Sequence, residues 1–286
     1  MNQARLQPIN RRRFLKRGLM WLAAAAGLAV GGGGYSVLVE RRWLMIRSLA
    51  LTLPSLPNPF KGVKLVQFSD VHLGHYYEAQ DLQKIAELIL KQQPDVICFT
   101  GDLVDEDHEE LAQVVPVLQK MEAPLGKFAV LGNHDYRAGA GRVVKALERG
   151  GFHVLRNSHV RVQRNGSSLY MAGVDDALYG DADLPRTLQG IPDQACTILL
   201  AHEPDVAVRA AAHPVALQLS GHSHGGQVRL PFWGHVLTPP LARKYVDGWH
   251  AVEESRLQVF VNRGLGTTIL PIRFLCRPEL TVITLN

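Results

Sequence analysis

Hydrophobic and polar positions in the first half of the chain follow a repeated order of apolar runs and amphipathic segments. Apolar runs with the length of buried strands occur at 63–69, 95–100 and 127–131. Leucine, isoleucine or valine recurs at the spacing of helices over 79–91, 109–121 and 141–148. This order predicts βα repeats whose three strands run parallel.

From residue 152 onwards the pattern changes to short strand-like runs. They occupy 152–155, 159–164, 168–173, 196–201, 216–220, 257–262 and 279–285. We expect these runs to form a second sheet that stacks on the first and is flanked by helices. The pattern therefore predicts a single α/β domain over residues 61–286.

The N-terminal region differs in composition from the rest of the chain. The 22 residues from Gly18 to Val39 carry no charge, and a segment of this length can span a bilayer. A leader and membrane anchor is therefore predicted over residues 1–50. No A-x-A cleavage site follows the run, which favours an anchor that is retained. Leu51 to Phe60 contains three prolines and is expected to be an extended linker over residues 51–60.

The segment from Asn10 to Lys16 resembles the twin-arginine export signal, which implies the twin-arginine export machinery as a partner. Six basic residues precede the uncharged run and three follow it, so the N-terminus is expected in the cytoplasm. The expected location is the bacterial cell membrane, with the catalytic domain outside the cytoplasm. The alternatives are a cleaved, exported protein and one that binds peripherally at the cytoplasmic face.

The charge of the chain is unevenly distributed. Residues 1–47 contain nine basic residues against Glu40 alone, so the net charge of +5 leaves about −3 for the other 239 residues. A nucleic-acid groove needs basic charge on the folded domain, and nucleic acid is therefore not favoured as a partner. The three cysteines are far apart and indicate no disulfide framework.

Five clusters of polar donors follow one another along the chain, several of them directly after predicted strands. They are Asp70-Val-His72, Gly101-Asp102, Gly132-Asn-His-Asp135, His202 and Gly221-His-Ser-His224. All supply oxygen or imidazole nitrogen and none a thiolate, which is typical of a two-metal site that hydrolyses a phosphate ester. The carboxyl ends of parallel strands share one edge, so we expect the clusters to meet there.

The order D-x-H, G-D, G-N-H-D/E, H and G-H-x-H resembles the calcineurin-like metallophosphoesterase superfamily over about residues 60–286. The segments Gly221–Gln227 and Asn262–Gly266 resemble its branch of exported or membrane-bound bacterial phosphodiesterases. The resemblance implies a four-layer α/β/β/α sandwich with two divalent metal ions. Mixed nitrogen and oxygen donors suit Mn, Fe, Zn, Ni or Co.

Carried over block by block, the resemblance implies a ligand set for each ion. One ion would take Asp70, His72, Asp102 and His224. The other would take Asp102, Asn133, His202 and His222. Asp102 would bridge the two, and a water shared by the ions would lose a proton and attack phosphorus.

The remaining candidates surround these ligands. His134 would assist the leaving group. Asp135 would orient that imidazole or cap a helix, and Asp105 is a candidate partner behind the ligands. His75 and Arg263 are candidate substrate contacts, with a solvated loop residue and a structural arginine as their alternatives.

The resemblance thus predicts a metal-dependent hydrolase of phosphodiester or pyrophosphate bonds. Lipid-linked or nucleotide-sugar phosphates are the expected substrates, because an anchored site meets amphiphiles. The alternatives are a phosphomonoesterase or protein phosphatase, and a metal-binding envelope domain without catalysis.

Overall fold

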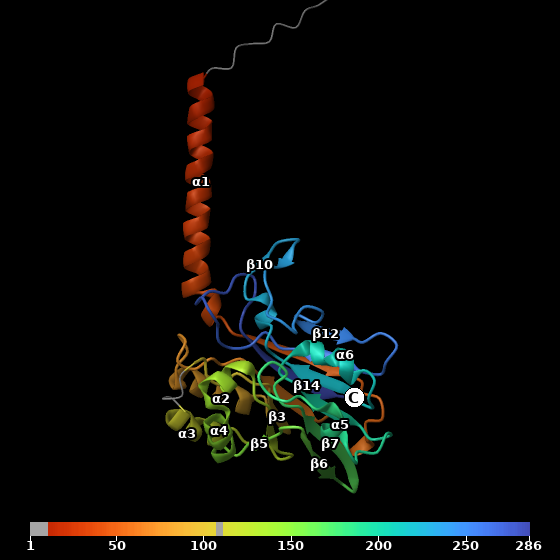
Figure 1. Cartoon of the computed structure of the whole chain (residues 1–286). Helices are drawn as coiled ribbons and strands as arrows, with labels where there is room; N and C mark the ends of the chain where they lie inside the picture. The colour runs from red at the N-terminus through yellow and green to blue at the C-terminus, as the bar shows by residue number, and fades with distance from the viewer. Residues whose placement is uncertain (1–10, 107–110) are drawn as a thin grey trace, which may run out of the picture.

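The first of two six-stranded sheets contains the predicted βα repeats (Figure 1). The structure is a computed structural model and describes residues 11–106 and 111–286. Across this sheet the strands are β1 (Met45–Leu51), β14 (Glu279–Leu285), β2 (Lys64–Phe68), β3 (Val96–Phe99), β4 (Lys127–Ala129) and β5 (His153–Val154). The strands β2, β3, β4 and β5 are parallel, which confirms the predicted arrangement of 63–69, 95–100 and 127–131.

The second sheet is also mixed and is built from the later part of the chain. The runs at 152–155 and 279–285 were expected in this sheet as well, but as β5 and β14 they belong to the first one. Its strands, in order, are β12 (Gly248–Ala251), β13 (Gln258–Val261), β9 (Leu217–Ser220), β8 (Thr197–Leu200), β7 (Ser167–Gly173) and β6 (Ser158–Arg164). The central strands β13, β9, β8 and β7 are parallel. A separate hairpin is formed by β10 (Arg229–Leu230) and β11 (Gly234–His235).

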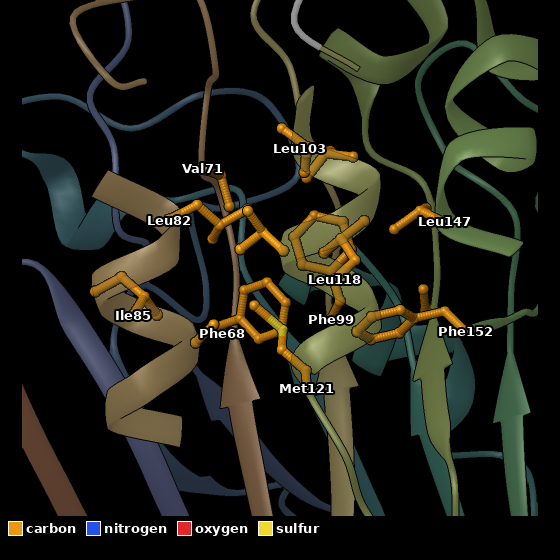
Figure 2. Close-up of a cluster of buried hydrophobic side chains, with 14 of the residues drawn as sticks. Phe68, Val71, Leu82, Ile85, Phe99, Leu103, Leu118, Met121, Leu147 and Phe152 are labelled. Atoms are coloured by element: carbon orange, nitrogen blue, oxygen red, sulfur yellow. The ribbon is translucent and has the colours of Figure 1, made fainter. Parts of the chain in front are cut away.

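Three helices cover the outer face of the first sheet, and an apolar core fills the space between them (Figure 2). The helices are α2 (Ala79–Lys91), α3 (Leu111–Lys120) and α4 (Asn133–Arg149). Phe68 and Phe99 of the sheet stack with ring centroids 4.9 Å apart, and Leu82, Leu118 and Leu147 meet them from the three helices. The start of the helix predicted over 109–121 lies outside the described residues.

A second core lies between the two sheets. It joins Leu65 and Phe128 of the first sheet to Leu200 and Leu219 of the second. A third core packs the other face of the second sheet against the short helices α5 (Leu184–Leu188) and α6 (Ala207–Ala210). Short 3₁₀ helices occupy Glu40–Arg42, Asn58–Phe60, Pro204–Val206 and His224–Gly226.

The helix α1 (Arg11–Leu38) projects from the body of the protein (Figure 1). It contains all but the last residue of the segment over 18–39 that was predicted to cross a membrane. Among residues 11–106 and 111–286, no helix is both long and apolar enough to do so. The prediction counted uncharged positions, and the four glycines at 31–34 lower the hydropathy of that stretch. Residues 1–10, which include the first residue of the export-like motif, lie outside the described residues.

The segment before Lys61 contributes to the folded body. β1 pairs in parallel with β14 along its whole length, and Leu53 and Phe60 are buried in the core between the sheets. The sequence predicted an anchor and a linker here, with the domain beginning near Lys61. β1 lies at the edge of its sheet, and its alternate side chains are only half-buried up to Leu51, so it lacks the continuous apolar run of the central strands.

We expect Phe60→Ala to lower the free energy of unfolding by roughly 3–5 kcal/mol, because it empties a site in the core between the sheets. The neighbouring Lys61 is exposed, so Lys61→Ala is the matched control and should change little. Urea unfolding followed by circular dichroism measures both. If Phe60→Ala unfolds at the midpoint of the wild-type chain, residues 51–60 are a linker rather than part of the core.

Candidate metal centre

The five polar clusters meet where strands of both sheets end. β2, β3, β8 and β9 lead directly into Asp70, Asp102, His202 and His222, while Asn133 begins α4 just after β4. Because the central strands of each sheet run parallel, these ends lie on one edge. The predicted meeting of the clusters is therefore confirmed.

The backbone at this edge adopts an uncommon conformation. Five residues of the clusters have φ between 49° and 66°, in the left-handed region: Asp70, His72, Asp102, His222 and His224. This region is costly for residues other than glycine, and such strain gathers at functional sites. The packing of the surrounding cores therefore keeps these five residues in a strained backbone conformation.

Glycines precede several of the clusters because the site leaves no room for a side chain. A Cβ atom at Gly132 would overlap the carboxylate of Asp102 and the ring of His202. A Cβ atom at Gly221 would overlap Asp70 in the same way. These glycines thus allow the backbone to approach the carboxylates closely.

The carboxylate of Asp102 lies at the centre of the cluster. Its Oδ2 atom is 3.2 Å from Nε2 of His202 and 3.6 Å from Nε2 of His72. On one side, Nε2 of His224 lies 3.0 Å from Nε2 of His72 and 3.5 Å from Oδ1 of Asp70. On the other side, the ring of His222 lies with its centroid 4.8 Å from that of His202.

The outer nitrogens of three histidines are held by oxygen acceptors. Nδ1 of His72 is 2.9 Å from the Asp105 carboxylate, and Nδ1 of His202 is 2.7 Å from the carbonyl of Thr100. Nε2 of His222 is 2.9 Å from the carbonyl of Pro240. Because these oxygens only accept, each outer nitrogen carries the proton. In the neutral form of each ring, the inner nitrogen therefore has a lone pair directed into the cluster.

The inner space is therefore lined by acceptors. Around His202, its Nε2 atom, the amide oxygen of Asn133 at 3.3 Å and the Asp102 carboxylate converge. Three overlapping groups place their ligand atoms within 4.8 Å of one another: Asp70, His72 and His224; His72, Asp102 and His134; and Asp102, His202 and His222. Converging acceptors repel one another unless a cation lies among them, so this donor set fits divalent metal ions.

The electrostatics agree with this assignment. Burial and the charge of His202 lower the pKa of His222 to about 4, so its ring is neutral and offers a lone pair at neutral pH. Burial and the charge of His72 lower the pKa of His224 as well. Burial also opposes the charged form of His202, but the adjacent Asp102 outweighs it and raises the pKa of His202. This part of the cluster thus attracts positive charge.

Asp105 supports two of the histidines. Its carboxylate contacts Nδ1 of His72 and lies 3.1 Å from Nδ1 of His134. Although burial opposes it, these two hydrogen bonds keep the pKa of Asp105 below its usual range. Burial likewise opposes the charged form of His134, but the hydrogen bond that its ring donates to Asp105, with the charges of Asp102 and Asp105, outweighs burial and raises the pKa of His134. Asp105 is thus the carboxylate that contacts both rings.

Asp135 is fully buried and accepts hydrogen bonds from the backbone. Its carboxylate accepts from the amides of Asp102 at 2.9 Å, Leu103 at 2.8 Å and Gly132 at 3.0 Å. Burial and the charge of Asp102 raise its pKa to about 7, against the lowering effect of these amides. Asp135 therefore joins the loop after β3 to the first turn of α4. It is the third residue of that helix, as in a capping box.

The two candidate substrate contacts lie in different places. His75 lines a cavity of about 930 Å³ above the cluster, together with His134 and Asn133. Arg263 instead donates through Nε and Nη2 to Asp247, at 3.0 Å and 2.6 Å. Among the described residues, Arg263 is not part of the cavity wall. Its guanidinium is engaged in this ion pair.

Arg137 lines the same cavity and did not emerge from the sequence. It lies three residues after His134 on α4, so both side chains share one face of the helix. The guanidinium lies over the ring of Tyr179 at 5.3 Å and donates to its hydroxyl at 3.2 Å. The i,i+3 spacing could have indicated Arg137, but the sequence placed the start of this helix only at residue 141.

Comparison with known proteins agrees with the site. The family profile described as calcineurin-like phosphoesterase matches residues 63–226. The metallophosphoesterase YkuE of Bacillus subtilis is 42% identical over 98% of this chain and 99% of its own. The phosphodiesterase YaeI of Escherichia coli is 29% identical over 97% of this chain and 99% of its own.

A solved structure of Thermus thermophilus, TT1561, superposes with a TM-score of 0.49 at 14% identity, over 71% of this chain and 90% of that one. The family profile covers more than half of this chain, and the Bacillus relative covers almost all of it. The chain belongs to the calcineurin-like phosphoesterase family.

Proposed function

We propose that the protein is a phosphohydrolase with two metal ions that cleaves phosphodiester bonds. The observation that carries this proposal is the position of Asp102, whose Oδ2 atom lies between a histidine of each ligand set, 3.6 Å from Nε2 of His72 and 3.2 Å from Nε2 of His202. Asp70, His72 and His224 surround it on one side, and Asn133, His202 and His222 on the other. A shared carboxylate supports two cations because it lowers their mutual repulsion.

The residues on each side would hold one ion. Asn133 offers an amide oxygen, which adds a ligand without adding charge. The absence of sulfur among the donors suits Mn, Fe, Zn, Ni or Co. When bound, a pair of such ions supplies an activated water and neutralises the charge that develops on the phosphoryl group.

In this proposal His134 delivers a proton to the leaving oxygen. Its Nδ1 atom is held by Asp105, which leaves Nε2 as the nitrogen that can donate. Its backbone amide donates to Oδ1 of Asp102 at 2.9 Å, which fixes the start of α4 against the ligands. Asp105 therefore acts as a positioning residue that keeps the imidazole oriented and favours its protonated form.

A diester as substrate is supported by the size of the cavity. Its volume of about 930 Å³ lies at the upper end of the range for small-molecule sites, which leaves room for groups on both sides of a phosphate. Arg137 lies on its wall beside His134 and could contact a phosphate oxygen. The E. coli relative bears the name phosphodiesterase.

We also propose that the protein is exported and acts outside the cytoplasm. The resemblance of residues 10–16 to a twin-arginine signal supports this location. A reporter that is active only outside the cytoplasm, fused at the C-terminus, should be active in cells with the export machinery. Activity of a cytoplasm-specific reporter at the same position would contradict export.

We expect Asp102→Asn to lose most of the bound metal, because the variant replaces the shared carboxylate with a neutral amide. The wild-type chain should carry two ions per chain by elemental analysis. Asp193 is exposed and outside the cavity wall, so Asp193→Asn serves as the control and should retain both ions. An Asp102→Asn chain with wild-type metal content and wild-type turnover of an aryl phosphodiester would refute the two-ion proposal.

We expect His134→Ala to lower kcat for an aryl phosphodiester by about 10²–10⁴, the usual contribution of a positioned acid, while the metal content stays unchanged. His153 is an exposed histidine on β5, and His153→Ala should leave kcat as it is. Turnover is measured with Mn, Zn or Mg for both a diester and a monoester. Faster monoester turnover would favour a phosphomonoesterase, and two bound metals without any turnover a non-catalytic domain.

A further inference from the structure

Exposed apolar side chains lie on the wall of the cavity and in the adjacent hairpin turn, and we call this set the apolar rim. Its members are Phe232, Trp233, Val236, Leu237, Ile269 and Leu270. Phe232 is fully exposed, Trp233 is 82% exposed and Ile269 is 80% exposed. Clustered exposure of large apolar side chains is unusual on a soluble surface and marks a site of contact.

The apolar rim continues into the cavity. Val236, Leu237, Ile269 and Leu270 line its wall, and Ile272 lies on the same wall. The base of the cavity holds the metal ligands and His134. The site therefore changes from a polar base to an apolar mouth along one continuous surface, which matches the polarity of an amphiphile.

The backbone holds two of these side chains outward in spite of strain. Phe232, in the turn of the β10–β11 hairpin, has φ of 63°, and Ile269 has φ of 64°. Such values are outliers for bulky or β-branched residues, and strain of this kind points to a functional role. A hairpin of two two-residue strands also offers little edge for a protein partner to extend.

The apolar rim lies at the end of the molecule from which α1 projects. The amide of Arg273 donates to the carbonyl of Ser36 in α1. The amide of Arg229, the first residue of the hairpin, donates to the carbonyl of Phe274 next to Arg273. Figure 1 shows the hairpin directed to the same side as α1. Exposed aromatic and aliphatic side chains continue along α1, among them Phe14, Leu19 and Trp21.

The charge of the mouth differs from that of the body. Residues 224–246 and 263–278, which carry the apolar rim, contain arginines and a lysine but no aspartate or glutamate. The chain after residue 47 is acidic overall, with a net charge of about −3. These two segments thus lack the carboxylates that would repel an anionic lipid headgroup.

We propose that the apolar rim inserts into a lipid bilayer and that the substrate is a phosphate ester with a long hydrocarbon chain, drawn from that bilayer. This inference rests on the proposed phosphohydrolase function. The phosphate reaches the ligands at the base while the chain lies along Leu237, Leu270 and Ile272. An exposed tryptophan beside phenylalanine is typical of the interfacial region of a membrane.

Insertion is tested on the full chain by fluorescence of Trp233 alone. Trp21, Trp43 and Trp249 are the other tryptophans and are changed to phenylalanine. With vesicles of brominated phosphatidylcholine and phosphatidylglycerol, we expect the Trp233 emission to shift to the blue and to be quenched. The matched control keeps only Trp249, which lies on β12 and donates to Gln258, and should show neither change.

Membrane binding by α1 does not itself change the signal, because α1 carries no tryptophan in either chain. Emission of Trp233 that is unaffected by vesicles would overturn the proposal. If Trp233 emission is unaffected and sedimentation shows a dimer that forms with increasing protein concentration, the apolar rim is instead a contact between two copies of the chain.

The substrate class is tested with two chromogenic diesters that share one leaving group, p-nitrophenyl methyl phosphate and p-nitrophenyl dodecyl phosphate. We expect KM for the dodecyl ester to be about tenfold or more lower, because its chain buries apolar surface in the cavity. Phe232→Ser with Trp233→Ser should remove this advantage when the ester is presented in vesicles and leave turnover of the methyl ester unchanged. Neither residue lines the cavity wall.

The outcomes separate the two proposals. Hydrolysis of neither ester would refute the proposed function, while quenching of Trp233 would still test the membrane contact. Equal KM values for both esters, with no effect of the serine variant, would refute the lipid substrate and leave the phosphodiesterase intact.

Discussion

The buried acceptors around Asp102 impose the strongest constraint on this structure. Two imidazole nitrogens lie within 3.6 Å of one carboxylate oxygen, and the outer nitrogens of three rings are occupied by Asp105, Thr100 and Pro240. The atoms that could hold metal ions therefore converge among side chains that are almost fully buried. Such an arrangement is stable only with positive charge at its centre. The stacked sheets, the strained ligand loops and the glycines at close approaches all serve to hold these acceptors together.

Much of the fold follows from periodicity, and much of the site from the order of its clusters. The strands β2, β3 and β4 are central and buried on both faces, so their apolar runs are continuous and predictable. The ligands follow such strands directly, which is why Asp70, Asp102 and His202 could be placed at one edge. β1 could not be predicted in this way, because an edge strand whose alternate residues are only half-buried has no continuous apolar run. The length of the uncharged segment in α1 likewise did not predict its hydropathy, which is too low for a membrane-spanning helix.

The roles of the residues behind the ligands depend on tertiary contacts that sequence spacing does not encode. Asp135 is adjacent to His134 in sequence, yet its carboxylate accepts backbone amides, while Asp105, about thirty residues away, contacts the imidazole. Arg263 was a candidate for phosphate and is paired with Asp247. The apolar rim has no motif at all, since it arises from a hairpin turn and a loop that meet only in the folded chain.

The central claim is that one carboxylate supports two ions close together, and magnetic coupling tests it directly. Metal-free protein is titrated with Mn²⁺ and followed by electron paramagnetic resonance. If Asp102 bridges two ions, a multiline spectrum of an exchange-coupled pair should appear and reach its full intensity at two equivalents. A six-line spectrum of isolated Mn²⁺ at every loading up to saturation would contradict the account.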